Sequence, residues 1–240
     1  MRYIYLSPHL DDASLSAGGW IYEQTQLGNA VEIWTMMCGF PPTQELSPFA
    51  QYLHTQWGMD SAEEVVRGRR QEDINAANIL GATFQHFDFL DCIYRQNKNS
   101  EWLYTEIFRE PRADEADFPK QIADEISKRL KPDDKLICQF GIGKHVDHIL
   151  VRRAAELLGK PLLYVADIPY LFKSPEQLSS HTVGMKEKVE MVGETGIHVW
   201  QEALAAYQSQ IAMLFENPKV MREQIKQYCL SKHGVRFWFV

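Results

Sequence analysis

Two short clusters of histidine and aspartate, each directly after an apolar run, constrain the fold of this chain more than any other feature. The run Tyr3-Ile4-Tyr5-Leu6 leads into Ser7-Pro8-His9-Leu10-Asp11-Asp12, and the run 136–140 leads into His145-Val146-Asp147-His148. A short apolar run bounded by turn residues is typical of a buried strand. Open α/β sheets bind their ligands at the carboxyl ends of such strands. The two clusters therefore predict one site built from two distant segments.

Strand-like and helical patterns alternate along the chain. Runs rich in Val, Ile, Tyr, Phe and Trp predict strands near 2–7, 30–37, 83–89, 135–141 and 161–168, and helical patterns cover 13–27, 61–80, 118–131 and 146–158. This alternation predicts an α/β fold with a doubly wound, mostly parallel sheet and helices on both faces. Strands one and four are neighbours at the switch point of such a sheet, and there the two clusters would meet.

Three long segments interrupt the alternation at the carboxyl ends of predicted strands. We predict irregular loops over 39–60, 92–117 and 169–199, and long loops of this kind often cover a binding site. Two more helical patterns lie near 200–215 and 217–231, and residues 236–240 predict a packed strand or a plug against the core. A chain of 240 residues predicts a single domain over 1–240, with a core over 1–170 and C-terminal helices and a closing strand over 171–240.

Charge, hydropathy and cysteine spacing limit the classes of partner and the cellular location that we expect for this chain. The net charge is −7 and no Lys/Arg run is dense enough to follow a phosphate backbone, which disfavours nucleic acid and anionic membranes. No uncharged stretch approaches the roughly 18 apolar residues of a membrane span, and no signal-peptide pattern opens the chain. The four cysteines lie far apart, which predicts reduced thiols and a cytoplasmic location. These patterns do not encode the oligomeric state, so a homo-oligomer stays an open alternative.

The spacing within each cluster suits a metal ion. A catalytic zinc takes about three protein ligands from His, Asp or Glu and keeps one position open. His9 and Asp12 lie three residues apart at a strand-to-helix junction. His145 and His148 have the same spacing on one face of the fourth predicted helix. Zinc would activate water and polarise an amide carbonyl, so the clusters favour a metal-dependent hydrolase. His/Asp ligation also suits Fe²⁺ or another divalent ion.

Each piece also has a purely structural interpretation. The pair Asp11-Asp12 suits an N-cap and a first-turn acid, which satisfy free backbone N–H groups and complement the helix dipole. A lone histidine is more often a surface or hydrogen-bonded core residue than a ligand. We assign the remaining histidines to that group: His54, His86, His181, His198 and His233. Two clusters at two strand ends are much harder to explain in this way.

The same residues resemble a known family. Ser7-Pro8-His9-Leu10-Asp11-Asp12, followed by Gly18-Gly19, resembles the first motif of the PIG-L/LmbE-like zinc-dependent N-acetylglucosaminyl deacetylases, and residues 143–148 resemble their His-x-Asp-His motif. Arg69-Arg70-Gln71-Glu72 resembles their Arg-x-x-Glu helix. The agreement covers residues 1–170, with a weaker signature at 205–210. Leu10 and Ala13 depart from the usual Ala-His-Pro-Asp-Asp-Glu, so the substrate of any one relative is not carried over.

The resemblance implies a Rossmann-like fold and removal of an N-acyl group, usually N-acetyl, from an amino sugar or a GlcNAc-containing small molecule. It implies three zinc ligands: His9, Asp12 and His148. It also implies a general base, Asp11; a cation facing the developing oxyanion, His145; a partner for that cation, Asp147; and sugar contacts, Arg69 and Asp91. Either Asp11 or His145 could protonate the leaving amine.

Some of these roles have alternatives. Arg69 also suits a helix-surface cation paired with Glu72 or Asp73, and Asp91 also suits the cap of a turn. The alternative function is a metal-binding α/β domain that acts on a non-sugar amide or has no catalytic activity. A nucleotide-binding domain is disfavoured, because no Gly-x-Gly-x-x-Gly or Gly-x-x-x-x-Gly-Lys-Ser/Thr motif follows the first strand.

Overall fold

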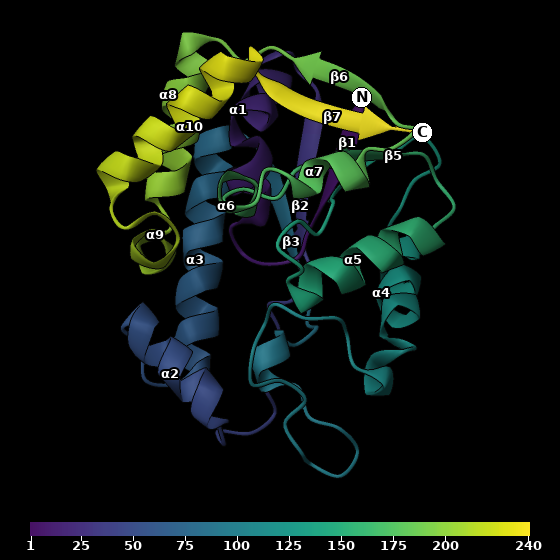
Figure 1. The fold of residues 1–240 in the computed structure, drawn as a ribbon, viewed down its shortest axis with the longest axis vertical. Helices are drawn as coiled ribbons and strands as arrows, with labels where there is room; N and C mark the ends of the chain where they lie inside the picture. Colours follow the sequence, from purple (N-terminus) through teal and green to yellow (C-terminus); the bar gives the residue numbers. More distant parts are fainter.

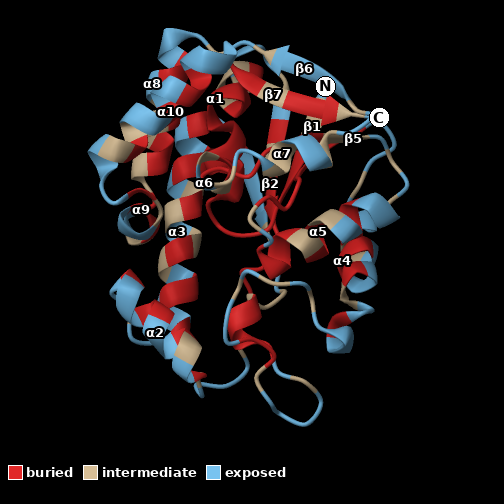
Figure 2. Ribbon diagram, viewed as in Figure 1, coloured by how far each residue is buried: buried red, intermediate tan, exposed pale blue.

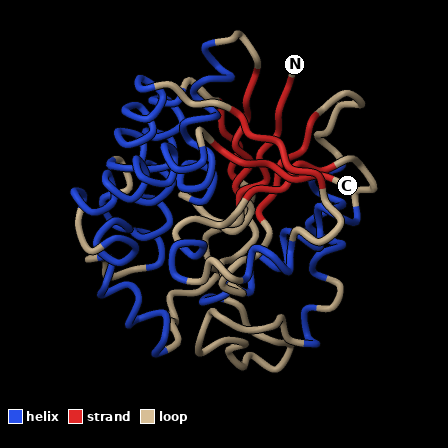
Figure 3. The backbone as a smooth tube through the Cα atoms, turned by 45° about the horizontal axis from the view of Figure 1, so that its top comes forward, coloured by secondary structure: helices blue, strands red, loops and turns tan.

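A computed structural model describes residues 1–240 and contains one seven-stranded sheet with helices on both faces (Figures 1 and 3). The strands are β1 (Arg2–Ser7), β2 (Ala30–Thr35), β3 (Thr83–His86), β4 (Lys135–Gln139), β5 (Leu162–Val165), β6 (Lys186–Glu190) and β7 (Val235–Phe239). Their order is β3-β2-β1-β4-β5-β7-β6. Strands β1 to β5 run parallel, and β7 pairs antiparallel with β5 and β6. The predicted mostly parallel α/β fold is confirmed.

The helices form two groups. They are α1 (Asp12–Gln26), α2 (Pro48–Trp57), α3 (Ala62–Leu80), α4 (Phe118–Ser127), α5 (Val146–Leu157), α6 (Tyr170–Lys173), α7 (Gln177–His181), α8 (Glu194–Ala205), α9 (Gln208–Phe215) and α10 (Pro218–Lys232). Helices α1, α3, α8 and α10 pack on one side of the sheet, and α4 and α5 pack together on the other (Figure 1). None of the helices has the length and apolar character needed to cross a membrane.

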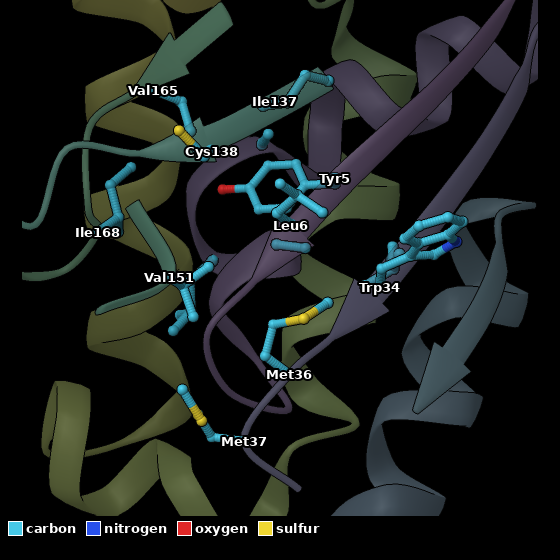
Figure 4. Close-up of a cluster of buried hydrophobic side chains, with 14 of the residues drawn as sticks. Tyr5, Leu6, Trp34, Met36, Met37, Ile137, Cys138, Val151, Val165 and Ile168 are labelled. Carbon is cyan, nitrogen blue, oxygen red and sulfur yellow. The ribbon is translucent and has the colours of Figure 1, made fainter. Parts of the chain in front are cut away.

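The central strands of the sheet are buried between these two groups, whereas the edge strands β3 and β6 are largely exposed (Figure 2). One cluster of 61 buried hydrophobic residues fills the interior. Figure 4 shows part of it, with side chains from β1, β2, β4, β5 and α5: Tyr5, Leu6, Trp34, Ile137, Cys138, Val165 and Val151. On one side, α1 approaches α8 so closely that a Cβ atom at Gly18 would lie 2.4 Å from Trp200 Cδ1. A strand with both faces covered in this way must be apolar along its length, as the runs in β1 and β4 are.

The switch point of the sheet lies where the sequence predicts it. Strand β1 pairs with β2 on one side and with β4 on the other, so Leu6 lies opposite both Trp34 and Cys138. The connections after β1 and β4 leave the sheet side by side, because parallel strands in this register end at the same edge. This edge carries both His/Asp clusters.

Two of the three predicted loops contain regular structure. Segment 39–60 includes α2, which begins after Ser47; the Ser47 hydroxyl accepts the Ala50 N–H at 3.0 Å, and Pro48 occupies the first turn. Gly58 ends this helix with a left-handed φ of 70°. These start and stop signals stand in the sequence, so the loop prediction was wrong there. Segment 92–117 contains only two 3₁₀ turns, Cys92–Tyr94 and Ala113–Glu115, and is largely irregular as predicted.

The C-terminal region also differs from the prediction. Segment 169–199 contains α6, α7, β6 and the start of α8. Strand β6 is a charged edge strand, and charges are typical of exposed edges rather than of the apolar strands that pattern analysis finds. The predicted helix 200–215 is broken at Tyr207, whose buried hydroxyl donates to Asp73 Oδ1 at 2.8 Å. The terminal run is strand β7 and not a plug.

Candidate active site

The two His/Asp clusters converge at the carboxyl ends of β1 and β4. The β1–α1 junction supplies His9, Asp11 and Asp12, and the start of α5 supplies His145, Asp147 and His148. The ring centre of His9 lies 4.6 Å from that of His145 and 5.3 Å from that of His148. All six side chains are buried. The tertiary structure therefore brings together the residues that the two sequence motifs predict.

The three predicted metal ligands meet at one carboxylate oxygen. Asp12 Oδ2 lies 3.2 Å from His9 Nδ1 and 3.3 Å from His148 Nε2, and it accepts the His9 backbone N–H at 2.8 Å. Neither carboxylate of the aspartate pair caps α1, because the Ala13 N–H donates to Ser7 Oγ at 3.1 Å instead. Asp11 thus occupies the N-cap position and Asp12 the first turn of α1, as the structural interpretation predicts, but neither makes a capping hydrogen bond.

The far nitrogen of each ligand histidine is held by a second carboxylate. His9 Nε2 lies 3.0 Å from Asp147 Oδ2, and His148 Nδ1 lies 2.7 Å from Asp167 Oδ1. Asp167 also accepts the backbone N–H groups of residues 141 and 142. Carboxylate–histidine pairs of this kind fix the tautomer of metal-binding imidazoles. The donor set and its outer carboxylates therefore fit a divalent metal ion at His9, Asp12 and His148.

Asp167 is a residue that the sequence analysis missed. It is fully buried directly after β5, the next strand beyond β4. Its position at the carboxyl end of a predicted strand was the available signal, but no motif distinguishes it from an ordinary loop aspartate.

The charges of this cluster alter each other's pKa values. Burial opposes ionisation of Asp12, but the cationic rings of His148 and His9 outweigh it and hold the pKa of Asp12 well below its usual range. Burial likewise opposes protonation of His148, yet Asp12 and Asp167 raise the pKa of His148 to about 9. For Asp11, burial and the neighbouring Asp12 charge raise the pKa to about 6, against the opposing pull of Arg69. A carboxyl group poised near neutral pH suits proton transfer.

His145 has a different environment from the one predicted. The backbone N–H of Asp147 donates to His145 Nδ1 at 3.2 Å, which leaves the ring proton on Nε2. Burial, together with the charges of His9 and His148, lowers the pKa of His145 well below 6.5. The expected pairing of His145 with the Asp147 carboxylate is therefore not formed in this structure, because that carboxylate contacts His9 and Arg95 instead.

His145 is also close to the predicted ligands. One ring nitrogen from each of His9, His145 and His148 lies within 4.8 Å of the others. A metal ion could therefore draw on His145 as an additional donor. The tautomer above instead leaves its Nε2–H free to donate to a bound group.

A cavity opens over the cluster and places Arg69 and Asp91 in its wall. The wall has a polar part, with His9, Asp11, Asp12, Arg69, Asp91, His145 and Gln210, and an apolar part, with Leu15, Leu53, Trp57, Ile93, Ile107, Ile168, Pro169, Tyr170, Met213 and Leu214. The polar part of the wall thus includes residues of the cluster itself, and the rest of the wall is apolar. This division suits a ligand with a polar reacting group and an apolar remainder.

Arg69 is not the helix-surface cation of the alternative interpretation. It is buried, its Nη2 lies 3.8 Å from Asp11 Oδ2, and its guanidinium stands 5.0 Å from the centre of the Trp57 ring. Glu72 instead accepts from Ser209. Asp91 caps the turn Cys92–Tyr94, because its side chain accepts the Ile93 N–H at 3.2 Å, and it also lines the cavity.

Two further cavity residues had no predicted role. Tyr170 follows β5, and its ring lies edge to face with His148 at 5.7 Å and with Phe108 at 5.6 Å. Gly143 makes room for this ring, since a Cβ atom there would lie 2.9 Å from Tyr170 Cγ. Gln210 lies at the end of the weak signature 205–210, which was the one sequence signal for it.

Comparison with known proteins gives concordant matches. The sequence profile of the PIG-L family, described as GlcNAc-PI de-N-acetylase, matches residues 4–158. The 2'-N-acetylparomamine deacetylase of Niallia circulans is 29% identical over 234 residues, which cover 89% of this chain and 82% of that protein.

Solved structures with similar folds extend over the whole chain. The zinc-inhibited form of teicoplanin deacetylase Orf2 is 28% identical, with a TM-score of 0.83, and the match covers 100% of this chain and 97% of that chain. The A40926 pseudoaglycone deacetylase Dbv21 is 27% identical, with a TM-score of 0.75, and the match covers 99% and 96% of the two chains. The 4-carboxy-2-hydroxymuconate hydratase GalB of Pseudomonas putida KT2440, at 19% identity and a TM-score of 0.56, shares the fold alone.

Proposed function

Because the chain belongs to the PIG-L family, we propose that it is a zinc-dependent N-deacetylase that removes an acetyl group from an amino sugar within a small molecule. One observation carries the proposal. His9 and His148 each lie between the Asp12 carboxylate and an outer carboxylate. Asp11 lies beside them, makes no capping hydrogen bond, and has its pKa raised to about 6. This arrangement separates the metal ligands from the proton carrier.

A metal ion bound at this site would supply a Lewis acid for the amide carbonyl and for the attacking water. We assign its ligands to His9, Asp12 and His148, whose donor atoms already face one another. Imidazole nitrogen and carboxylate oxygen in this number suit zinc, and they also accept Fe²⁺. Asp147 and Asp167 orient the two imidazoles through the nitrogens that face away from Asp12.

Asp11 takes the proton of the attacking water. Its carboxylate is adjacent to Asp12 but makes no hydrogen bond to either ligand histidine, so it remains available for the substrate side of the site. As the water oxygen bonds to the acyl carbon, the carbonyl oxygen gains negative charge. His145 Nε2–H is the donor we assign to this oxyanion, and a preorganised donor of this kind is worth about 10²–10³ in rate.

Asp11 also returns the proton to the leaving nitrogen. The C–N bond breaks, acetate is released, and the amine needs one proton. Asp11 holds the proton gained from water, whereas burial and the charges of His9 and His148 lower the pKa of His145 and disfavour a second proton on its ring. We therefore propose Asp11 for both transfers, which decides between the two alternatives left open by the sequence.

The cavity wall supports an amino sugar bound through its polar groups. We assign Arg69 and Asp91 to hydroxyl groups of the sugar, since both line the cavity beside the reacting centre. The apolar part of the wall would then face the remainder of the molecule. For the cellular location we propose the cytoplasm, in keeping with four buried cysteines and no disulfide.

The test combines metal analysis with a substrate panel. The purified protein is loaded with zinc, and acetate release is measured from N-acetylated amino sugars, N-acetylated aminoglycoside fragments and simple non-sugar amides, with and without a chelator. We expect about one zinc ion per chain and chelator-sensitive acetate release from the amino sugars only. Equal turnover of non-sugar amides would overturn the substrate class. Bound zinc without any turnover would favour a metal-binding domain without this activity.

A further inference from the structure

The long segment 92–117 carries a buried arginine that the mechanism above does not use. Arg95 follows the 3₁₀ turn Cys92–Tyr94 and is almost fully buried. Its guanidinium lies between the rings of Tyr104 and Phe118, 5.4 and 5.0 Å from their centres. A buried guanidinium is stable only when carboxylates compensate its charge, so its partners reveal its role.

Arg95 has two carboxylate partners, one on each side. Arg95 Nη1 lies 2.6 Å from Asp147 Oδ1, and Arg95 Nε lies 2.5 Å from Glu115 Oε1. Asp147 belongs to the first turn of α5, whereas Glu115 belongs to the far end of the same loop as Arg95. Tyr104 donates its hydroxyl to Glu115, so both ends of the loop are joined to this ion pair.

The Asp147 carboxylate contacts His9 as well as Arg95. Its Oδ2 accepts the Cys92 backbone N–H at 3.0 Å and lies 3.0 Å from His9 Nε2. Arg95 lies beside the other oxygen as an ion pair, so rotation of the carboxylate would disturb its contacts with Arg95, Cys92 and His9. A carboxylate fixed in this plane keeps the His9 proton on Nε2 and leaves Nδ1 facing Asp12.

The same loop forms part of the cavity wall. Ile93 and Ile107 line the cavity, and Ile107 accepts the backbone N–H of Val146 at 2.9 Å, next to His145. A displacement of the loop would therefore move the wall of the cavity together with the start of α5.

We propose that Arg95 is a positioning residue that fixes the metal ligand His9 through Asp147 and ties it to the cavity wall through Glu115. The inference rests on the proposed metal site but not on the identity of the substrate. By thermodynamic linkage, a contact that orders the ligand when the loop is in place must also order the loop when the metal is bound.

The first test measures zinc affinity directly, by competition with a chromophoric chelator. Arg95→Met should weaken zinc binding by up to about 10–100-fold, the usual cost of losing the outer partner of a ligand histidine, which here is Asp147. Glu115→Gln leaves the Arg95–Asp147 pair intact and should weaken zinc binding much less than Arg95→Met does. Arg153→Met is the matched control, because it removes an exposed pair between α5 and Glu110 of the same loop and should change nothing.

A double-mutant cycle separates positioning from general loss of packing. Asp147→Asn and Arg95→Met should be strongly non-additive in zinc affinity, because both act on one contact. If Arg95→Met does not fold, Arg95→Lys replaces it; Lys keeps the charge but cannot hold two carboxylates in a fixed plane, so its zinc affinity should also fall. Wild-type zinc affinity in every folded Arg95 variant would overturn the proposal.

The second test follows the loop. Zinc should slow amide hydrogen exchange over residues 95–115 in the wild type and in Arg153→Met, but not in Arg95→Met. Equal protection in all three proteins would show that the loop and the metal site are independent. Neither readout depends on enzyme activity. If Arg95→Met binds zinc more weakly than a wild type that deacetylates nothing, this inference is supported while the proposed function is refuted.

Discussion

Replacement of Asp11 by asparagine should abolish turnover and at the same time stabilise the metal-free protein. Asparagine has nearly the shape of a protonated aspartate but carries no charge. In the folded chain, burial and the adjacent Asp12 carboxylate disfavour ionised Asp11, and the attraction of Arg69 at 3.8 Å offsets only part of this. Ionised Asp11, the proposed base, therefore lowers the stability of the folded protein at neutral pH.

The size of the effect follows from linkage. The pKa of Asp11 is about 6 in the fold, against 3.8 for an unperturbed aspartate. A difference of about 2 in pKa, at 1.36 kcal/mol per unit, corresponds to about 3 kcal/mol at pH 7. The folded state binds the proton more tightly, so its stability falls as the pH rises from 4 to 6 and stays lower above 6. The gain from Asp11→Asn should therefore be full at pH 7 and vanish near pH 4.

Thermal and denaturant unfolding of the chelator-treated protein at pH 4, 5, 6 and 7 tests this reasoning. For a chain of this size, about 3 kcal/mol corresponds to a rise in Tm of about 6–12 °C at pH 7. Asp114→Asn is the control, because Asp114 is exposed and has no ion pair, and it should change Tm little. A variant that is less stable than the wild type at pH 7, or equally stabilised at pH 4 and pH 7, would refute the account of Asp11.

Three further predictions concern the reaction. His148→Ala should lose the metal itself, which metal analysis after gel filtration detects; full zinc occupancy would contradict its assignment as a ligand. His145→Ala should keep the metal and lower kcat about 10²–10³-fold, and an unchanged kcat would remove His145 from the mechanism. Arg69→Met should lower kcat/KM about 10–100-fold through a lost charged contact. It should also move the acid limb of the pH profile upward, because the Arg69 cation lowers the pKa of Asp11; an unmoved limb would separate the two residues.

The sequence was sufficient for the sheet and for the pairing of the two clusters. Buried parallel strands need continuous apolar runs, and β1 and β4 show such runs directly before their polar clusters. It was insufficient for β6. Strand β6 consists mostly of charged residues at an exposed edge, and α2 was overlooked although Ser47, Pro48 and Gly58 mark its ends.

Side-chain partners were decided by the tertiary structure. The local spacing already places His9, Asp12 and His148 at two strand ends, because a turn and the first turn of a helix fix their directions. The partner of Asp147 depends on where a distant loop places Arg95, and no local pattern encodes that. The burial of Arg69 and the support of His148 by Asp167 likewise arise from contacts between separate segments of the chain. The sequence by itself determined the two His/Asp clusters at the centre of the site; only the packing of the fold decided which carboxylates, arginines and cavity residues surround them.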